Sequence, residues 1–364
     1  MCPAPRHVTT TTVELTSVTA STIRLVPELV VIAEQLLAPV PGGTGRYTAE
    51  LLRALAATAP PGWEVTGVVA RHDVGVEGVR MLPLSPRALV GAWQLGLRYW
   101  PGGDAVHATT PLAPPRGRVS VTVHDTVPWT HPETLTPRGV AWHRAMIRRA
   151  ARRARGLVVP TRAVAEDLRR WVPVRVPVHV AGHGVAPALA TGVDVPDLPG
   201  RYVLAVGTLE PRKGVDVLLD AMAELDVPLV LVGQPGWGGV SVRRDGVDVR
   251  VLGRLPDAEL ATVLRQAGVL AAPSLAEGFG LPVLEALAAG VPVVHSDAPA
   301  LVEVAGGAGV CVPRGDAKAL AAALREVLSS PRPELVAAGR ARAAEFSWER
   351  AAEAVWAIHE RPRL

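Results

Sequence analysis

Residues 274–286 read SLAEGFGLPVLEA, and this stretch decides the fold. It follows a short apolar run at 269–272 that is typical of a buried strand, and it leads into a helical pattern at 281–289. Pro282 suits the first turn of that helix. Gly278 and Gly280 allow the main chain to approach a ligand closely, and the free N–H groups at the start of the helix favour an anion. The stretch therefore predicts a ligand-binding strand–loop–helix unit.

The same alternation of strand and helix patterns runs through most of the chain. Strands are predicted at 29–33, 65–70, 105–108, 119–123 and 157–159, and then at 202–206, 228–232, 249–252, 269–272, 291–294 and 309–312. Helices are predicted at 45–58, 88–98, 136–155 and 163–171, and then at 214–224, 257–267, 281–289, 316–329, 333–345 and 348–360. This order predicts an α/β fold with parallel sheets covered on both faces.

The length of the chain and a proline- and glycine-rich segment near its middle predict two Rossmann-like, doubly wound domains. The chain has 364 residues, and a domain commonly has roughly 100–200. Residues 186–200 are rich in proline and glycine and predict a linker. We expect domains at 29–190 and 200–346, a last helical segment at 347–364, and an N-terminal extension at 1–28 that is either disordered or a result of the choice of start site. Ligand crevices at the carboxyl ends of both sheets would face each other across a cleft.

Composition narrows the class of protein. Hydrophobic residues make up 49% and charged residues 20% of the chain, which is typical of a globular protein. The apolar runs are too short to span a bilayer, and no signal-peptide pattern begins the chain. With only two cysteines, Cys2 and Cys311, neither a disulfide framework nor a cysteine zinc site is expected. No Asp-x-Asp pair indicates a metal. We expect a cytoplasmic protein without a metal site.

The net charge of +4 is unevenly distributed. Residues 1–195 carry 21 basic and 13 acidic side chains, and much of the excess lies in the predicted helix 136–155. Arg144, Arg148, Arg152 and Arg155 share one face there at helical spacing. Two interpretations stay open: peripheral contact with an anionic membrane surface, or a solvated helix that covers the sheet. Nucleic acid is disfavoured because no aromatic platform accompanies the arginines.

Three further segments leave strand ends and carry candidate site residues. Residues 207–214 contain Arg212 and Lys213, one of only two lysines in the chain, and both side chains suit phosphate. Residues 41–47 read PGGTGRY, where Gly43 and Gly45 suit close approach of the backbone to phosphate or sugar and Thr44 is a candidate N-cap. Of two histidines at neighbouring strand ends, His107 and His124, one is expected to be structural.

These motifs occur in the order found in a known family. EGFGLP at 277–282 with Glu285, PRKG at 211–214, GGTGRY at 42–47 and His124-Asp125 resemble the retaining glycosyltransferases of family four, which have the two-domain architecture called GT-B. The pair Glu277 and Glu285 resembles the family's signature of two glutamates. Segments 253–260 and 346–348 are similar to its base-binding region and to the crossing back to the first domain. The resemblance covers residues 29–350.

The resemblance implies transfer of a sugar from a GDP- or UDP-linked donor, with mannose as the favoured sugar, to a glycan or lipid-linked acceptor. The first domain would take the acceptor and the second the donor. No cofactor beyond the nucleotide sugar is implied. Glu277 would hold the transferred sugar, Glu285 the ribose, and His124 would lie by the reacting sugar. Arg212 and Lys213 would bind the pyrophosphate and, with His124 and Glu277, act in catalysis. Further donor contacts would come from Gly43, Gly45, Arg254, Leu255, Gly278, Phe279, Gly280 and Leu281.

The chemistry is consistent with these roles, because fixed cations stabilise the departing diphosphate. Retention would follow from attack on the same face as the leaving group, with no covalent nucleophile. The alternatives are a phosphorylase or epimerase of the same fold and a non-catalytic sugar-nucleotide-binding protein. A glycosidase using Glu277 and Glu285 is disfavoured, since nearby cations would lower the pKa that a general acid needs raised.

Overall fold

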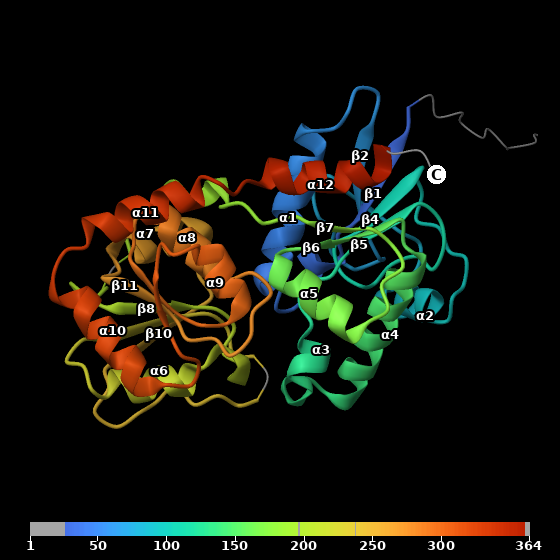
Figure 1. Cartoon of the computed structure of the whole chain (residues 1–364). Coiled ribbons are helices and arrows are strands. Elements are labelled where there is room, and N and C mark those ends of the chain that lie inside the picture. The colour runs from blue at the N-terminus through green and yellow to red at the C-terminus, as the bar shows by residue number, and fades with distance from the viewer. Residues whose placement is uncertain (1–25, 196, 237, 361–364) are drawn as a thin grey trace, which may run out of the picture.

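The structure, a computed structural model, describes residues 26–195, 197–236 and 238–360 and contains two parallel sheets with helices on both faces (Figure 1). The first sheet has the order β3-β2-β1-β4-β5-β6-β7 and the second β10-β9-β8-β11-β12-β13. All registered pairs are parallel. The predicted α/β, doubly wound class is confirmed.

The strands of the first sheet are β1 (Glu28–Ile32), β2 (Glu64–Val69), β3 (Val79–Met81), β4 (Ala105–Ala108), β5 (Val119–Thr122), β6 (Gly156–Val159) and β7 (Val178–Val180). Its helices are α1 (Gly42–Ala57), α2 (Pro86–Gln94), α3 (Val127–Thr130), α4 (Pro137–Arg153) and α5 (Arg162–Trp171). Strand β1 is buried at all five positions because helices cover both faces of the sheet, which explains its nearly unbroken apolar sequence.

The strands of the second sheet are β8 (Val203–Val206), β9 (Leu229–Val232), β10 (Val249–Gly253), β11 (Val269–Ala272), β12 (Val293–Ser296) and β13 (Val310–Val312). Its helices are α6 (Val215–Met222), α7 (Asp257–Gln266), α8 (Leu281–Ala289), α9 (Pro299–Ala305), α10 (Ala317–Ser329) and α11 (Pro333–Ala343). In each sheet the strand order reverses beside the first strand, between β1 and β4 and between β8 and β11. Ligands of such sheets bind outside these reversal points.

The last helix, α12 (Trp348–Glu360), lies beside α1 and also contacts β5, β6 and β7 of the first sheet (Figure 1). His359 of α12 hydrogen-bonds to the buried Ser120 at 2.7 Å, and Ser120 in turn contacts Nδ1 of His107 at 2.8 Å. Helix α12 therefore packs on the first sheet although it follows the second sheet in the sequence. Residues 1–25, most of the predicted extension, lie outside the described residues.

The helices and strands that the sequence did not predict are short. Strands β3 and β7 have three residues each and lie at the edges of the first sheet, where the alternation of apolar residues is weak. Helices α3 and α9 have four and seven residues, too few for a helical period to show. The start of α1 was placed too late: the helix begins at Gly42 with Pro41 at the N-cap, so the prediction of Thr44 as N-cap is wrong.

The four-arginine face predicted on helix 136–155 is also wrong in part. Helix α4 ends at Arg153, and Arg155 donates from Nε to the carbonyl of Ile358 on α12 at 2.6 Å. Arg144 donates to the carbonyl of Pro128 in α3 at 2.8 Å. Both side chains are half-buried because Arg144 joins α4 to α3 and Arg155, beyond the end of α4, contacts α12, whereas Arg148 and Arg152 are exposed.

Candidate active site

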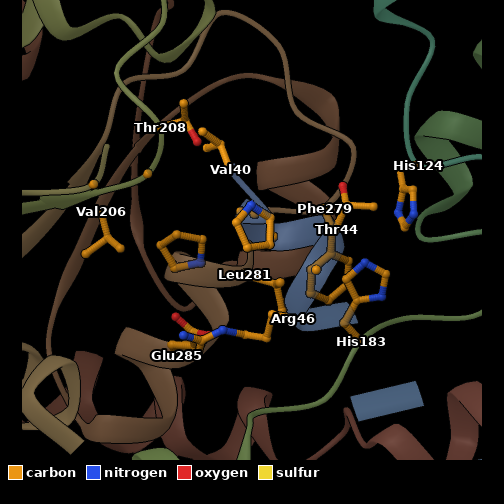
Figure 2. Close-up of a pocket in the computed structure, with 18 of the residues that line it drawn as sticks. Val40, Thr44, Arg46, His124, His183, Val206, Thr208, Phe279, Leu281 and Glu285 are labelled. Carbon is orange, nitrogen blue, oxygen red and sulfur yellow. The ribbon is translucent and has the colours of Figure 1, made fainter. Parts of the chain in front are cut away.

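A cavity of about 1040 Å³ lies where the carboxyl ends of the two sheets meet, and both halves of the chain line it (Figure 2). It brings together all the site residues predicted from the sequence. From the first half these are Gly43, Gly45 and His124, and from the second half Arg212, Lys213, Arg254, Leu255, Glu277, Gly278, Phe279, Gly280, Leu281 and Glu285. The volume suits a ligand of several linked groups.

Glu277 is the centre of a charged cluster at one end of the cavity. Its carboxylate accepts from Lys213 Nζ at 2.5 Å, from Arg212 Nη1 at 3.2 Å and from Ser274 Oγ at 2.8 Å. Arg212 also donates to the carbonyl of Ala276 at 2.9 Å and to Glu210 at 2.5 Å. The two cations are thus held by the loop that precedes α8, and their positions are fixed before any ligand arrives.

Electrostatics keep this cluster ionised. Burial alone would raise the pKa of Glu277, but Lys213 and Arg212 outweigh it and lower that pKa to about 2. Burial would lower the pKa of Arg212, but Glu277, Glu210 and Asp125 outweigh it and raise that pKa above its already high value. The cavity wall therefore places two cations beside carboxylates, an arrangement that can bind both an anion and sugar hydroxyls.

Glu285, on α8, lies at another part of the cavity and is paired across the cleft. Arg46 of α1 donates to its Oε1 at 2.9 Å and to Oδ1 of Asp257 on α7 at 2.6 Å. Figure 2 shows the guanidinium of Arg46 beside the Glu285 carboxylate. Burial raises the pKa of Glu285 to about 7, with Arg46 opposing and Asp257 reinforcing the rise. The expectation that neighbouring cations lower a carboxyl pKa holds for Glu277, whereas at Glu285 burial outweighs the cation.

The loop before α8 also touches the first half of the chain. Thr161 donates to the carbonyl of Gly278 at 3.0 Å. A Cβ on Gly278 would lie 1.8 Å from the carbonyl oxygen of His124. Gly280 has a φ of 95° and a Cβ there would lie 2.4 Å from Leu301. Close contact with the His124 backbone therefore requires Gly278, and the positive φ requires Gly280, in addition to any approach of a ligand.

His124 faces the cavity and His107 does not. Nε2 of His124 lies 2.7 Å from the carbonyl of Thr109, which can only accept, so that nitrogen carries the proton. Burial lowers the pKa of His124, and the ring is neutral at physiological pH. His107 is fully buried between Ser120 and Thr122 and is the structural histidine of the pair. The edge of Tyr47 packs on His124 with ring centroids 4.7 Å apart.

The glycines of the first loop differ in their surroundings. Gly43 is exposed, and a Cβ there would reach Leu281 across the cleft at 3.7 Å. Gly45 is buried, and a Cβ there would lie 2.3 Å from Cβ of Pro41. The packing of the first turn of α1 therefore explains why residue 45 is a glycine. The contact of Gly45 with the donor stays a prediction.

Arg46, Asp257 and His183 are among the cavity residues that were not predicted. Arg46 and Asp257 lay inside the quoted motifs but had no assigned role, and only the approach of α1 to α7 and α8 pairs them. His183 packs against Phe279 with ring centroids 4.3 Å apart and ring planes tilted by 35°, and it lies beside Phe279 in Figure 2. Its flanking glycines, Gly182 and Gly184, were the available signal, since Cβ atoms there would meet Phe346 and Trp348.

Within residues 26–360, apart from 196 and 237, no group of three or more histidine, cysteine, aspartate or glutamate side chains could hold a metal ion. No helix among those residues is long and apolar enough to cross a bilayer.

Two facing doubly wound sheets with paired cations at a shared cavity define a two-part α/β protein whose cavity suits anionic, hydroxyl-rich ligands. Residues 41–189 match the family model Glycosyltransferase Family 4, and residues 200–330 match the model Glycosyl transferases group 1. The chain therefore belongs to the group 1 glycosyltransferases of family 4, a family of retaining hexosyltransferases with the GT-B fold.

Curated relatives include mannosyltransferases. The chain is 39% identical to the O-antigen chain mannosyltransferase B of Escherichia coli over 41% of its own length and 42% of the relative. It is 37% identical to the phosphatidyl-myo-inositol mannosyltransferase of Mycobacterium leprae over 54% and 58%, so these matches span about half of each relative. A phosphatidyl-myo-inositol mannosyltransferase of Mycobacterium tuberculosis matches at 28% over 88% of this chain and 93% of that protein.

Solved structures share the fold at low identity. Sucrose-phosphate synthase from Thermosynechococcus elongatus superposes with a TM-score of 0.70 at 22% identity, covering 92% of this chain and 98% of that one. The Anabaena protein HepE in complex with UDP and glucose has a TM-score of 0.69 at 16% identity, covering 92% and 99%. At these identities the likeness shows the GT-B fold alone.

Proposed function

We propose that this protein transfers a hexose, with mannose favoured, from a nucleoside-diphosphate sugar to a hydroxyl of a glycan or lipid-linked acceptor, with retention of anomeric configuration. The observation that carries this proposal is the cluster of Arg212, Lys213 and Glu277 beside the start of α8, in a cavity that both sheets line. The mannosyltransferase relatives support the choice of sugar.

The cations would act on the leaving group. Breaking the bond between sugar and phosphate places negative charge on the diphosphate, and Arg212 and Lys213 are held ready to receive it. Preorganised charge costs no rearrangement during the reaction, and one such donor commonly contributes on the order of 10²–10³ in rate. Glu277, ionised at neutral pH, would accept hydrogen bonds from hydroxyls of the transferred sugar.

His124 would lie by the reacting sugar as a neutral ring. Because Nε2 donates to Thr109, Nδ1 is the nitrogen without a proton and can accept a hydrogen bond. The attacking hydroxyl would pass its proton to the departing phosphate oxygen on the same face of the sugar. Under this mechanism no side chain forms a covalent bond to the sugar. Among the remaining predicted contacts, Gly43, Arg254 and Leu255 line the cavity where the phosphates and the base would extend.

We further propose that the acceptor is presented at the cytoplasmic face of a membrane. Arg148, Arg152 and Arg153 are exposed on α4, and Leu95 and Leu97, just beyond α2, are 80% and 56% exposed. Arg149 donates to the carbonyl of Gln94 at 2.6 Å and so joins the basic helix to the segment that carries the two leucines. Cations beside exposed apolar side chains suit an anionic lipid surface. A relative named for phosphatidyl-myo-inositol is consistent with such an acceptor.

The decisive experiment is a donor and acceptor panel. Purified protein is incubated with GDP- and UDP-linked hexoses and with glycan or lipid acceptors, and release of the nucleoside diphosphate and the anomeric configuration of the product are measured. Transfer with retention supports the proposal. Binding of a donor without transfer to any acceptor would favour the non-catalytic binding protein, and transfer to inorganic phosphate would favour the phosphorylase.

A further inference from the structure

Arg46 stands out among the cavity residues because it belongs to the first half of the chain yet pairs with the second. Its two terminal nitrogens reach Glu285 on α8 and Asp257 on α7, at 2.9 and 2.6 Å. The Arg46 side chain is 19% exposed and that of Glu285 only 3% exposed. An ion pair this well shielded is screened little by solvent.

Arg46 is mounted on a rigid part of α1. The preceding residue, Gly45, packs against Pro41, and the following residue, Tyr47, is buried with its hydroxyl 2.9 Å from Thr122. Thr48 donates to Thr109 at 3.1 Å. These contacts fix the first two turns of α1, so the guanidinium is aimed at Glu285 by the fold itself.

Glu285 depends on this guanidinium for its charge. Of the groups on elements around α8, Arg46 and Asp257 are the ones that act on it. Glu303 of α9 instead accepts from the main chain of Arg162 and Ala163, Arg342 of α11 donates to the carbonyl of Val304, and His295 of β12 is bonded to the carbonyl of Ser296. Arg340 of α11 lies at Gly290, beyond the end of α8. Burial and the neighbouring Asp257 both raise the pKa of Glu285, and loss of Arg46 would remove the cation that opposes this rise.

From this geometry we infer that Arg46 is a positioning residue, which holds Glu285 as an oriented carboxylate so that it can accept hydrogen bonds from the ribose diol of the donor. The inference rests on the proposed function, in which Glu285 contacts the ribose. Two hydroxyl donors require a carboxylate with acceptors on both oxygens, and a protonated carboxyl loses one of them. Charge-assisted bonds are also the stronger ones.

The test compares ribonucleotide and dideoxyribonucleotide binding. Calorimetry with GDP or UDP and with the matching 2′,3′-dideoxynucleoside diphosphate is run on the wild type, Arg46→Met and Arg46→Lys. We expect Arg46→Met to weaken binding of the ribonucleotide on the order of tenfold at pH 7 and to leave the dideoxy compound within about twofold. Arg46→Lys should restore part of the loss. Arg325→Met, which removes an exposed ion pair with Glu224 far from the cavity, is the matched control.

The pH dependence provides a second readout. In the wild type the preference for the ribonucleotide should grow as pH rises through about 7, where Glu285 becomes charged. In Arg46→Met that rise should move to higher pH. Equal weakening of both nucleotides, tighter binding by Arg46→Met, or an unmoved pH profile would each overturn the inference. If the wild type binds no nucleoside diphosphate at all, the proposed function itself fails.

Discussion

The carbonyl oxygen of His124 and the α-carbon of Gly278 are in direct contact across the cleft: a methyl group on Gly278 would come within 1.8 Å of that oxygen. The histidine lies two residues beyond β5 of the first sheet, and the glycine lies in the loop between β11 and α8 of the second. This contact sets how closely the loop with Glu277 can approach the wall formed by His124.

Gly278→Ala should therefore reduce kcat/KM by about 10²-fold or more, because a displacement of about 1 Å at a reacting centre can cost that much. The variant should still fold, since the clash lies between the two halves of the chain. Gly91→Ala is the control: a Cβ there meets nothing within 4 Å inside helix α2, and the change should leave activity intact. Steady-state kinetics and circular dichroism check both variants. Full activity of Gly278→Ala would show that the contact is not needed.

Lys213→Ala should lower kcat on the order of 10²–10³-fold, because it removes a preorganised cation from the leaving-group side of the cavity. The chain offers a matched control in Lys318, its only other lysine, which is exposed on α10. Lys318→Ala should keep wild-type kinetics. Should both lysine variants turn over equally, the assignment of the phosphate-binding cluster would be wrong.

Acid should destabilise the protein through Glu277. Its pKa is about 2 in the folded state against 4.5 for the free group, so its stabilising effect is present above pH 4.5 and is lost as pH falls toward 2. The full shift corresponds to about 3 kcal/mol at most. Glu277→Gln should flatten the fall in unfolding free energy over that range, measured by urea titration at several pH values. An unchanged slope would contradict the pairing with Lys213 and Arg212.

Glu285 should change the free energy of unfolding with pH in the direction opposite to Glu277. Its pKa is raised from 4.5 to about 7 in the folded state, so the folded protein holds this proton more tightly than the unfolded chain. Its contribution is fully present below pH 4.5 and is lost as pH rises through 7. Glu285→Gln should remove that decline in unfolding free energy between pH 4.5 and 7. A decline as steep as that of the wild type would show that another group causes it.

The exposed basic side chains of α4 should mediate binding to anionic vesicles. Replacing Arg148 and Arg152 together by serine should weaken co-sedimentation with phosphatidylglycerol-containing vesicles by roughly tenfold or more, at about 1 kcal/mol per cation near the surface. Raised salt should weaken binding of the wild type as well. Replacing Arg243 and Arg325, exposed in the second half, is the matched control. Absence of wild-type binding at low salt would end the membrane proposal.

Local signals predicted the fold and most of the cavity wall. The strand–loop–helix unit at 269–289 was placed almost to the residue, because apolar runs, glycines and Pro282 act over a few neighbouring positions. Pairings between distant segments were not accessible in the same way. Arg46 and Glu285 are 239 positions apart in the sequence. Nothing in the residues around either one indicates that the start of α1 lies beside α8. The arginines of α4 were misassigned in part for the same reason, since the partners of Arg144 and Arg155 lie on other elements.

The sequence by itself determined the doubly wound α/β class, the family motifs and the part of the cavity wall that those motifs form, because these depend on local periodicity and on short motifs at strand ends. Only the tertiary structure decided the ionisation of the two glutamates. Both are buried in the same cavity, yet Glu277 faces two cations and Glu285 faces one cation and a carboxylate. A carboxyl group's pKa is set by its solvation and by charges within a few ångströms, and those neighbours come from parts of the chain that only folding brings together.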